Sequence, residues 1–182
     1  MQSHRHTRRR LGRVFALASL LFAFVAVGFA QAQTQDQQQQ PQPETETFQD
    51  WTLACIQLED GTRSCRMLQN VGNEQGQVVM QAAIILLPDG NPGLLLNLPL
   101  GVWLADGVSI QIDGGEQLSV PYARCLQPPD QCRVELVLDQ TRVSQLRAGT
   151  QINVTFFDPR QQPIRARISL LGFTAAFNGL TG

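Results

Sequence analysis

Short apolar segments that alternate like strands, each ended by turn-forming residues, constrain the fold of this chain more than any other feature. In residues 108–113 (VSIQID) the apolar side chains fall on one face and the polar ones on the other. Residues 134–138 and 152–156 alternate in the same way. Gly, Pro, Asn and Asp separate such segments, as in PDGNPG at 88–93. Closely spaced short strands of this kind predict an all-β sandwich or barrel.

Nine segments fit this description. The expected strands are Thr52–Gln57, Arg63–Gln69, Gln77–Leu87, Leu94–Asn97, Val108–Ile112, Val120–Arg124, Arg133–Leu138, Gln151–Phe157 and Arg165–Leu171. One short connecting helix is also expected, because Asp139 can cap it and Gly149 can end it. Val143 and Leu146 would share its buried face. We see no repeat and no second core, so we expect one domain over residues 47–182.

The beginning of the chain has the order of a secretory signal peptide. Residues 1–13 are basic, residues 14–29 form a run of 16 apolar or small residues, and AQA at 30–32 is a small-x-small cleavage pattern. The apolar run is shorter than the roughly 20 residues of a membrane span. We expect a signal peptide over residues 1–32, cleavage after Ala32, and no integral membrane span in the mature chain. An uncleaved N-terminal anchor is the alternative.

The composition changes sharply after the expected cleavage position. Residues 33–46 contain mainly Gln, Thr, Pro and acidic residues, with almost nothing apolar. A segment of this kind cannot offset its ordering entropy by burial. It therefore predicts a disordered, Gln- and Pro-rich linker between the leader and the folded domain.

The charged residues of the expected mature chain exclude several function classes. They are nine arginines and fifteen acidic residues, a net charge of −6, without the basic cluster that nucleic-acid binding needs. The sequence has no lysine, and both histidines, His4 and His6, lie in the leader. Most nucleophilic catalysis and most zinc sites depend on such side chains. We therefore expect a protein that is not an enzyme and that holds no metal or cofactor.

Four cysteines lie in the predicted domain, at Cys55, Cys65, Cys125 and Cys132. In an exported chain an even number of cysteines indicates two disulfides, for which three pairings exist. We favour Cys55–Cys65, which flank a predicted hairpin turn, and Cys125–Cys132, which flank a proline-containing turn. A redox pair or a four-thiolate metal site is the alternative, and the lack of C-x-x-C spacing disfavours it.

The run LPLGVW at 98–103 is the most distinctive segment outside the alternating pattern. The candidate interaction residues within it are Leu98, Pro99, Leu100, Gly101 and Trp103. Tryptophan is favoured at interface centres, whereas the alternative is a buried turn in which Gly101 takes an unusual backbone conformation. Phe173 is a further candidate, in a C-terminal tail that could contact the envelope. We favour the alternative that Phe173 and Phe177 pack onto the end of the sandwich.

The charged side chains of the domain are interpreted as solvent-facing. The acidic candidates are Asp106, Asp113, Glu116, Glu135 and Asp139. They fit turn residues, and an acid–base pair or a calcium site is the alternative. Arg165 and Arg167 alternate along the last expected strand and are expected on its solvent face, with a carboxylate-binding pair as the alternative.

A series of short motifs runs along the predicted domain in a fixed order. They are Asp50-Trp51 ahead of Cys55, Cys65-Arg66-Met67, Leu98-Pro99-Leu100-Gly101-Val102, Gly107-Val108 leading to Asp113, Pro121-Tyr122 before Cys125, Cys132, Leu146-Arg147-Ala148-Gly149, and Ser169-Leu170-Leu171-Gly172-Phe173 with Ala176. By these motifs, which cover about residues 48–177, the chain resembles the invasion-associated locus B family of bacterial envelope proteins. It departs from the family at Gln131, where a glycine usually precedes the fourth cysteine, and in a longer loop between the last two cysteines.

The resemblance implies an immunoglobulin-like, two-sheet antiparallel β-sandwich in a periplasmic, surface-associated or secreted bacterial protein. The family is tied to no known reaction or cofactor. We therefore expect an envelope protein that acts through contact with envelope or host proteins. One alternative is a periplasmic carrier of a small ligand or lipid, with an apolar pocket between the sheets near Trp103. Another is an enzyme that uses carboxylates alone, such as a glycan hydrolase.

Overall fold

The computed structural model of the protein describes residues 42–73 and 75–182. The expected signal peptide and residues 33–41 of the expected linker lie outside these ranges. The expected linker boundary at residue 46 needs correction, because the first strand begins at Glu44 and pairs with the strand that follows it. The last three residues of the expected linker are therefore part of a sheet.

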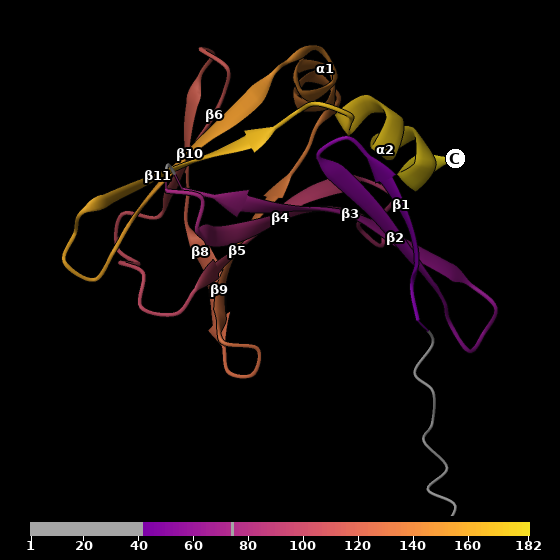
Figure 1. Cartoon of the computed structure of the whole chain (residues 1–182), viewed down its shortest axis with the longest axis horizontal. Coiled ribbons are helices and arrows are strands. Elements are labelled where there is room, and N and C mark those ends of the chain that lie inside the picture. The colour runs from indigo at the N-terminus through magenta and orange to yellow at the C-terminus, as the bar shows by residue number, and fades with distance from the viewer. Residues whose placement is uncertain (1–41, 74) are drawn as a thin grey trace, which may run out of the picture. The chain divides into compact units, whose positions relative to one another are not determined.

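Within the described residues, the strands form two antiparallel sheets, one of seven strands and one of four (Figure 1). In spatial order, the larger sheet contains β1 (Glu44–Phe48), β2 (Trp51–Gln57), β3 (Arg63–Gly72), β4 (Val78–Leu86), β5 (Pro92–Pro99), β9 (Gln131–Val137) and β8 (Tyr122–Leu126). The smaller sheet contains β11 (Pro163–Ser169), β10 (Gln151–Phe157), β6 (Val108–Ile112) and β7 (Gln117–Val120). The predicted all-β sandwich of two antiparallel sheets is confirmed.

Alternation located most strands, and it failed where the chain changes sheets. β6 and β10 have the predicted bounds. The single strand expected over Val120–Arg124 is wrong, because β7 ends at Val120 in the four-stranded sheet and β8 begins at Tyr122 in the seven-stranded sheet. Pro121 separates them, and proline cannot donate a ladder hydrogen bond. The chain therefore passes from one sheet to the other at this residue.

The predicted connecting helix is present as α1 (Gln140–Ala148), with Val143 and Leu146 buried. The Asp139 carboxylate caps its start by accepting a 2.8 Å hydrogen bond from the backbone N–H of Arg142. The expectation of a single helix is wrong, because a second helix, α2 (Phe173–Thr181), follows the last strand.

α2 buries one face, formed by Phe173, Ala176, Phe177 and Leu180. These positions have helical spacing, so burial of the apolar face accounts for a helix that has no side-chain cap. Gly172 precedes α2 with φ of +82°, and a Cβ added there would lie 2.0 Å from the carbonyl oxygen of Phe48. Only glycine allows this close approach between the start of α2 and the turn after β1.

A buried polar junction joins the two sheets. Trp51, on β2, is fully buried, and its indole Nε1–H donates to the carbonyl oxygen of Ser169, on β11, at 2.9 Å. Gln69, on β3, donates to the same oxygen at 3.1 Å and accepts from the backbone N–H of Ser169 at 2.8 Å. The Gln69 amide also donates to the carbonyl oxygen of Asp50 at 3.1 Å. One side chain thus connects β3, β11 and the turn before β2.

Replacing Gln69 with leucine should lower the free energy of unfolding by about 2–3 kcal/mol, because the substitution leaves buried backbone groups without partners. Denaturant unfolding followed by tryptophan fluorescence measures the change. Gln117→Leu, at an exposed position of β7, serves as the matched control and should change stability by less than about 0.5 kcal/mol. Equal effects of the two substitutions would contradict a structural role for the junction.

Candidate interaction site

The candidate run at 98–103 forms the end of β5 and the start of the β5–β6 loop (residues 100–107). The turn at Leu100 and Gly101 is exposed, and Gly101 has φ of +90°. The expected unusual backbone conformation of Gly101 is therefore present, in an exposed turn and not a buried one. The backbone N–H of Trp103 donates to the carbonyl oxygen of Phe157, at the end of β10, at 2.9 Å. This bond holds the loop against the four-stranded sheet.

The loop presents apolar side chains to solvent. Leu100 is 40% exposed and Leu104 is 51% exposed, while Trp103 is half-buried between them in the sequence. Pro99 is also exposed. Leu98 is different: only 1% of it is exposed, because it faces the core on β5. The side chains able to contact a partner are thus those that follow Leu98.

Phe173 lies in the core and is 1% exposed. Its ring packs edge-on against Trp51, with centroids 5.6 Å apart, and is stacked with Phe177 at 5.5 Å. The guanidinium of Arg147, on α1, lies 5.0 Å from the centroid of Phe177. Phe173 and Phe177 therefore pack against the sandwich, as we favoured. The side chain of Phe173 is not exposed for contact with a partner.

The candidate carboxylates have structural partners or lie in turns. The Asp113 carboxylate accepts hydrogen bonds from the Thr150 hydroxyl at 2.6 Å and from the backbone N–H of Gln151 at 3.1 Å. The Thr150 hydroxyl bond holds the pKa of Asp113 below its usual value. Such a carboxylate stays ionised at neutral pH and cannot donate a proton as the acid of a glycan hydrolase must. Glu135 pairs with Arg124 at 2.8 Å, with both side chains substantially exposed.

Other candidate chemistries find little support in residues 42–73 and 75–182. This part of the chain contains no group of three or more His, Cys, Asp or Glu side chains placed to hold a metal ion. Its helices include none long and apolar enough to cross a membrane. Arg165 and Arg167 are exposed on β11, as expected, opposite Thr155 and Asn153 of β10.

The carrier alternative places an apolar pocket near Trp103, whereas the structure has a cavity at another position. A cavity of about 450 Å³ opens between the sheets beside α1, and its lining includes Leu94, Ile110, Leu136 and Leu146 but not Trp103. The sequence did not reveal this cavity, since its walls come from strands far apart in the chain.

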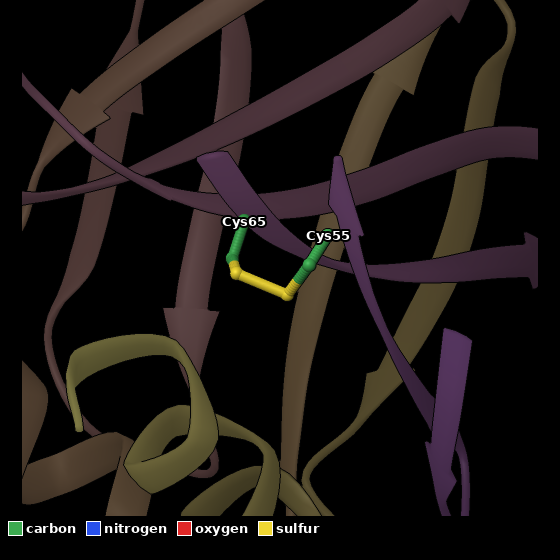
Figure 2. The surroundings of a disulfide bond; sticks show 2 residues. All are labelled: Cys55 and Cys65. Atoms are coloured by element: carbon green, nitrogen blue, oxygen red, sulfur yellow. A yellow bond between two sulfur atoms is a disulfide. The ribbon is translucent and has the colours of Figure 1, made fainter. Parts of the chain in front are cut away.

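Both favoured disulfides are present, and they account for all four cysteines. Cys55 and Cys65 occupy directly opposed positions of β2 and β3, where Figure 2 shows their side chains meeting. Cys125 and Cys132 are likewise opposed on β8 and β9. Each bond therefore joins neighbouring strands of the seven-stranded sheet.

Tyr122 is a half-buried residue whose hydroxyl is buried, which sequence reasoning missed. Among the described residues, its hydroxyl is the one buried side-chain polar atom that makes no hydrogen bond. Burial raises the pKa of Tyr122 to about 12. Its position directly after the sheet-crossing Pro121 places the ring against the core.

Comparison with known proteins decides the family. The family model for the invasion associated locus B (IalB) protein matches residues 51–181, which is the folded domain almost from end to end. The chain belongs to the IalB family.

Relatives and a solved structure agree with this assignment. An invasion protein B homolog of Brucella abortus is 36% identical over 135 residues, covering 72% of this chain and 76% of the relative. Invasion protein B of Bartonella bacilliformis is 29% identical over 138 residues, covering 74% of this chain and 73% of the relative. The crystal structure of invasion associated protein B from Bartonella henselae superposes with a TM-score of 0.65 at 28% identity, covering 75% of this chain and 94% of that one. The resemblance to the IalB family expected from the motifs is thereby confirmed.

Removing either disulfide of this IalB domain should destabilise it by about 2.5–3 kcal/mol, because each bond closes a short loop in the unfolded chain. We expect the larger loss for Cys55→Ala/Cys65→Ala, since Cys55 is 3% exposed and packs in the core. Cys125→Ala/Cys132→Ala is the comparison, because Cys125 is exposed and Cys132, although only 2% exposed, lies outside the core cluster that contains Cys55. Denaturant unfolding of the two double variants measures both losses. Unchanged stability in either would contradict a structural role for that bond.

The chain contains one tyrosine, so the ultraviolet absorbance of phenolate reports Tyr122 alone. In the folded protein its titration midpoint should lie near 12, against 10.0 for an ordinary tyrosine. The folded state holds the phenol proton more tightly than the unfolded state does. The contribution of Tyr122 to the free energy of unfolding is therefore constant below about pH 10 and is lost as the pH rises toward about 12. Denaturant should return the midpoint to the ordinary value. A midpoint of 10 in the folded protein would show that the hydroxyl is accessible to water.

Proposed function

We propose that this protein is exported and acts in the bacterial periplasm or at the cell surface through contact with envelope or host proteins. The pairing of every cysteine supports export, because disulfides form and persist in oxidising compartments. The N-terminal residues, with their signal-peptide pattern, support the same route. Relatives named invasion protein B support a role at the surface of the bacterium.

The observation that carries contact as the mode of action is the β5–β6 loop. It combines two exposed leucines, Leu100 and Leu104, with the half-buried Trp103. Aromatic anchors surrounded by apolar contacts dominate the binding energy of protein interfaces. The backbone bond from Trp103 to Phe157 anchors the loop to the end of β10, which limits the conformations open to it. A fixed loop loses less conformational entropy on binding than a mobile one.

We propose further that the protein is not an enzyme. The absence of lysine, together with the location of both histidines in the leader, removes the usual bases and nucleophiles from the expected mature chain. The best-positioned carboxylates have structural partners: Asp113 holds the start of β10, and Asp139 caps α1. Because these carboxylates already make structural hydrogen bonds, we assign the function of the domain to contact through its surface.

A photo-crosslinking amino acid at Leu100 or Leu104, in intact cells, tests the contact surface. We expect each position to give an adduct of defined mass with the same neighbouring protein. The same crosslinker at Leu171, which is 58% exposed and lies in the segment before α2, is the matched control. It should give no such adduct, because it is not part of the loop.

Two outcomes would contradict the proposal. One is the absence of any adduct from the loop positions, and the other is the same adduct pattern from the loop and from Leu171. Alkylation of the protein in the same cells reports its compartment, since free thiols in the folded protein would indicate that it was not exported.

A further inference from the structure

The cavity beside α1 has the size and position of a ligand site. Its volume of about 450 Å³ falls within the range of roughly 300–1,000 Å³ that small-molecule sites occupy. β5 and β9 form its wall on the seven-stranded sheet, and β6, β7 and β10 form the wall on the other sheet. α1 closes one side. The cavity therefore lies between the two layers of the sandwich, beside the edge strand β7.

The apolar side chains that line the cavity are all aliphatic. Leu94, Ile110 and Ile152 back the cavity from the core, and each is at most 2% exposed. Leu118 and Leu136 are only partly buried and lie nearer the opening. No aromatic side chain is among the described residues that line it. Such walls offer apolar contact without a surface for ring stacking, which suits a saturated chain better than a planar ring.

Charged groups occur at the edge of the cavity, and acidic ones predominate. Three carboxylates, those of Asp113, Glu116 and Asp139, line it together with one guanidinium, that of Arg142. Arg142 is paired with Asp139. Asp113 is hydrogen-bonded to Thr150 and the backbone after it. Glu116 is exposed and belongs to neither of the ion pairs formed by the described residues, so it is the group free to meet a ligand.

We propose that this cavity binds a single saturated aliphatic chain whose cationic amine head group lies at the opening beside Glu116. The apolar walls hold the chain, and the carboxylate attracts the head group. A fatty carboxylate would place its charge against this acidic edge. Arg142 is already paired with Asp139, the residue that also caps α1, so its charge is partly neutralised before any ligand binds. The inference concerns a site away from the β5–β6 loop and does not depend on the contact function.

Calorimetric titration of the oxidised protein with dodecylamine, dodecanol and dodecanoate tests the site and its head-group preference. We expect one saturable site for dodecylamine. Dodecanoate should bind about tenfold more weakly, because an exposed ion pair is replaced by two like charges. Decylamine should also bind roughly tenfold more weakly than dodecylamine, since it buries two fewer methylene groups.

Substitutions at the opening locate the binding. Leu118→Trp fills the entrance and should weaken dodecylamine binding at least tenfold, whereas Ser119→Trp, exposed on the same strand, should not. Because a large residue at Leu118 could unfold the domain, Gln145→Trp on the exposed part of α1 is a second block. Its matched control is Ser144→Trp, which is exposed but does not line the cavity. Circular dichroism shows whether each variant folds.

Glu116→Gln tests the charge itself and should bring the affinities for amine and alcohol together. Glu59→Gln, in an exposed turn outside the cavity, should leave their difference unchanged. The proposal is overturned by dodecanoate binding as tightly as dodecylamine, by no saturable site for the amine, or by undiminished binding to both folded entrance variants. Each of these results leaves the crosslinking test of the β5–β6 loop unaffected, so the two proposals fail separately.

Discussion

The sandwich depends on the junction at which Trp51 and Gln69 both donate to the carbonyl oxygen of Ser169. Two sheets that pack through apolar faces have no directional bond to fix how they are aligned. Here both backbone polar groups of Ser169, the last residue of β11, are hydrogen-bonded to the side chain of Gln69 on β3. The position of α2 follows from this, because the helix begins four residues after Ser169 and packs Phe173 against the same tryptophan. A buried polar group thus sets the geometry of an otherwise apolar interior.

The junction also explains where space remains between the sheets. β11 and β7 are the two edge strands of the four-stranded sheet. The hydrogen bonds of the junction hold β11 and do not involve β7. The cavity is lined from the β7 side, where Leu118 and the β9 residue Leu136 are only partly covered. α1 closes part of that side, and its cap at Asp139 lies at the edge of the cavity. The sheets are thus bonded to each other at the β11 edge of the smaller sheet, and the cavity remains at its β7 edge.

Sequence reasoning recovered what depends on local patterns. Period-two alternation found β6 and β10, Asp139 and Gly149 found α1, and the family motifs found the fold. It failed at Pro121, where one continuous segment contributes a strand to each of the two sheets. It also failed for α2, a helix that has no side-chain cap and is stabilised by burial of its apolar face. One missed signal was readable, since Gln69 occupies an inward position between the buried Met67 and Val71. The cavity had no such signal, because its walls meet only after the sheets have packed.

Both sulfur bridges lie within a single layer of the molecule. They cross-link β2 to β3 and β8 to β9, all of which belong to the seven-stranded sheet. The four-stranded sheet contains no disulfide and is attached through its chain connections, its packing and the hydrogen bonds at Ser169. A reducing environment would therefore act on the hairpins of the seven-stranded sheet. The contact between the two sheets would still be held by packing and by the hydrogen bonds at Ser169.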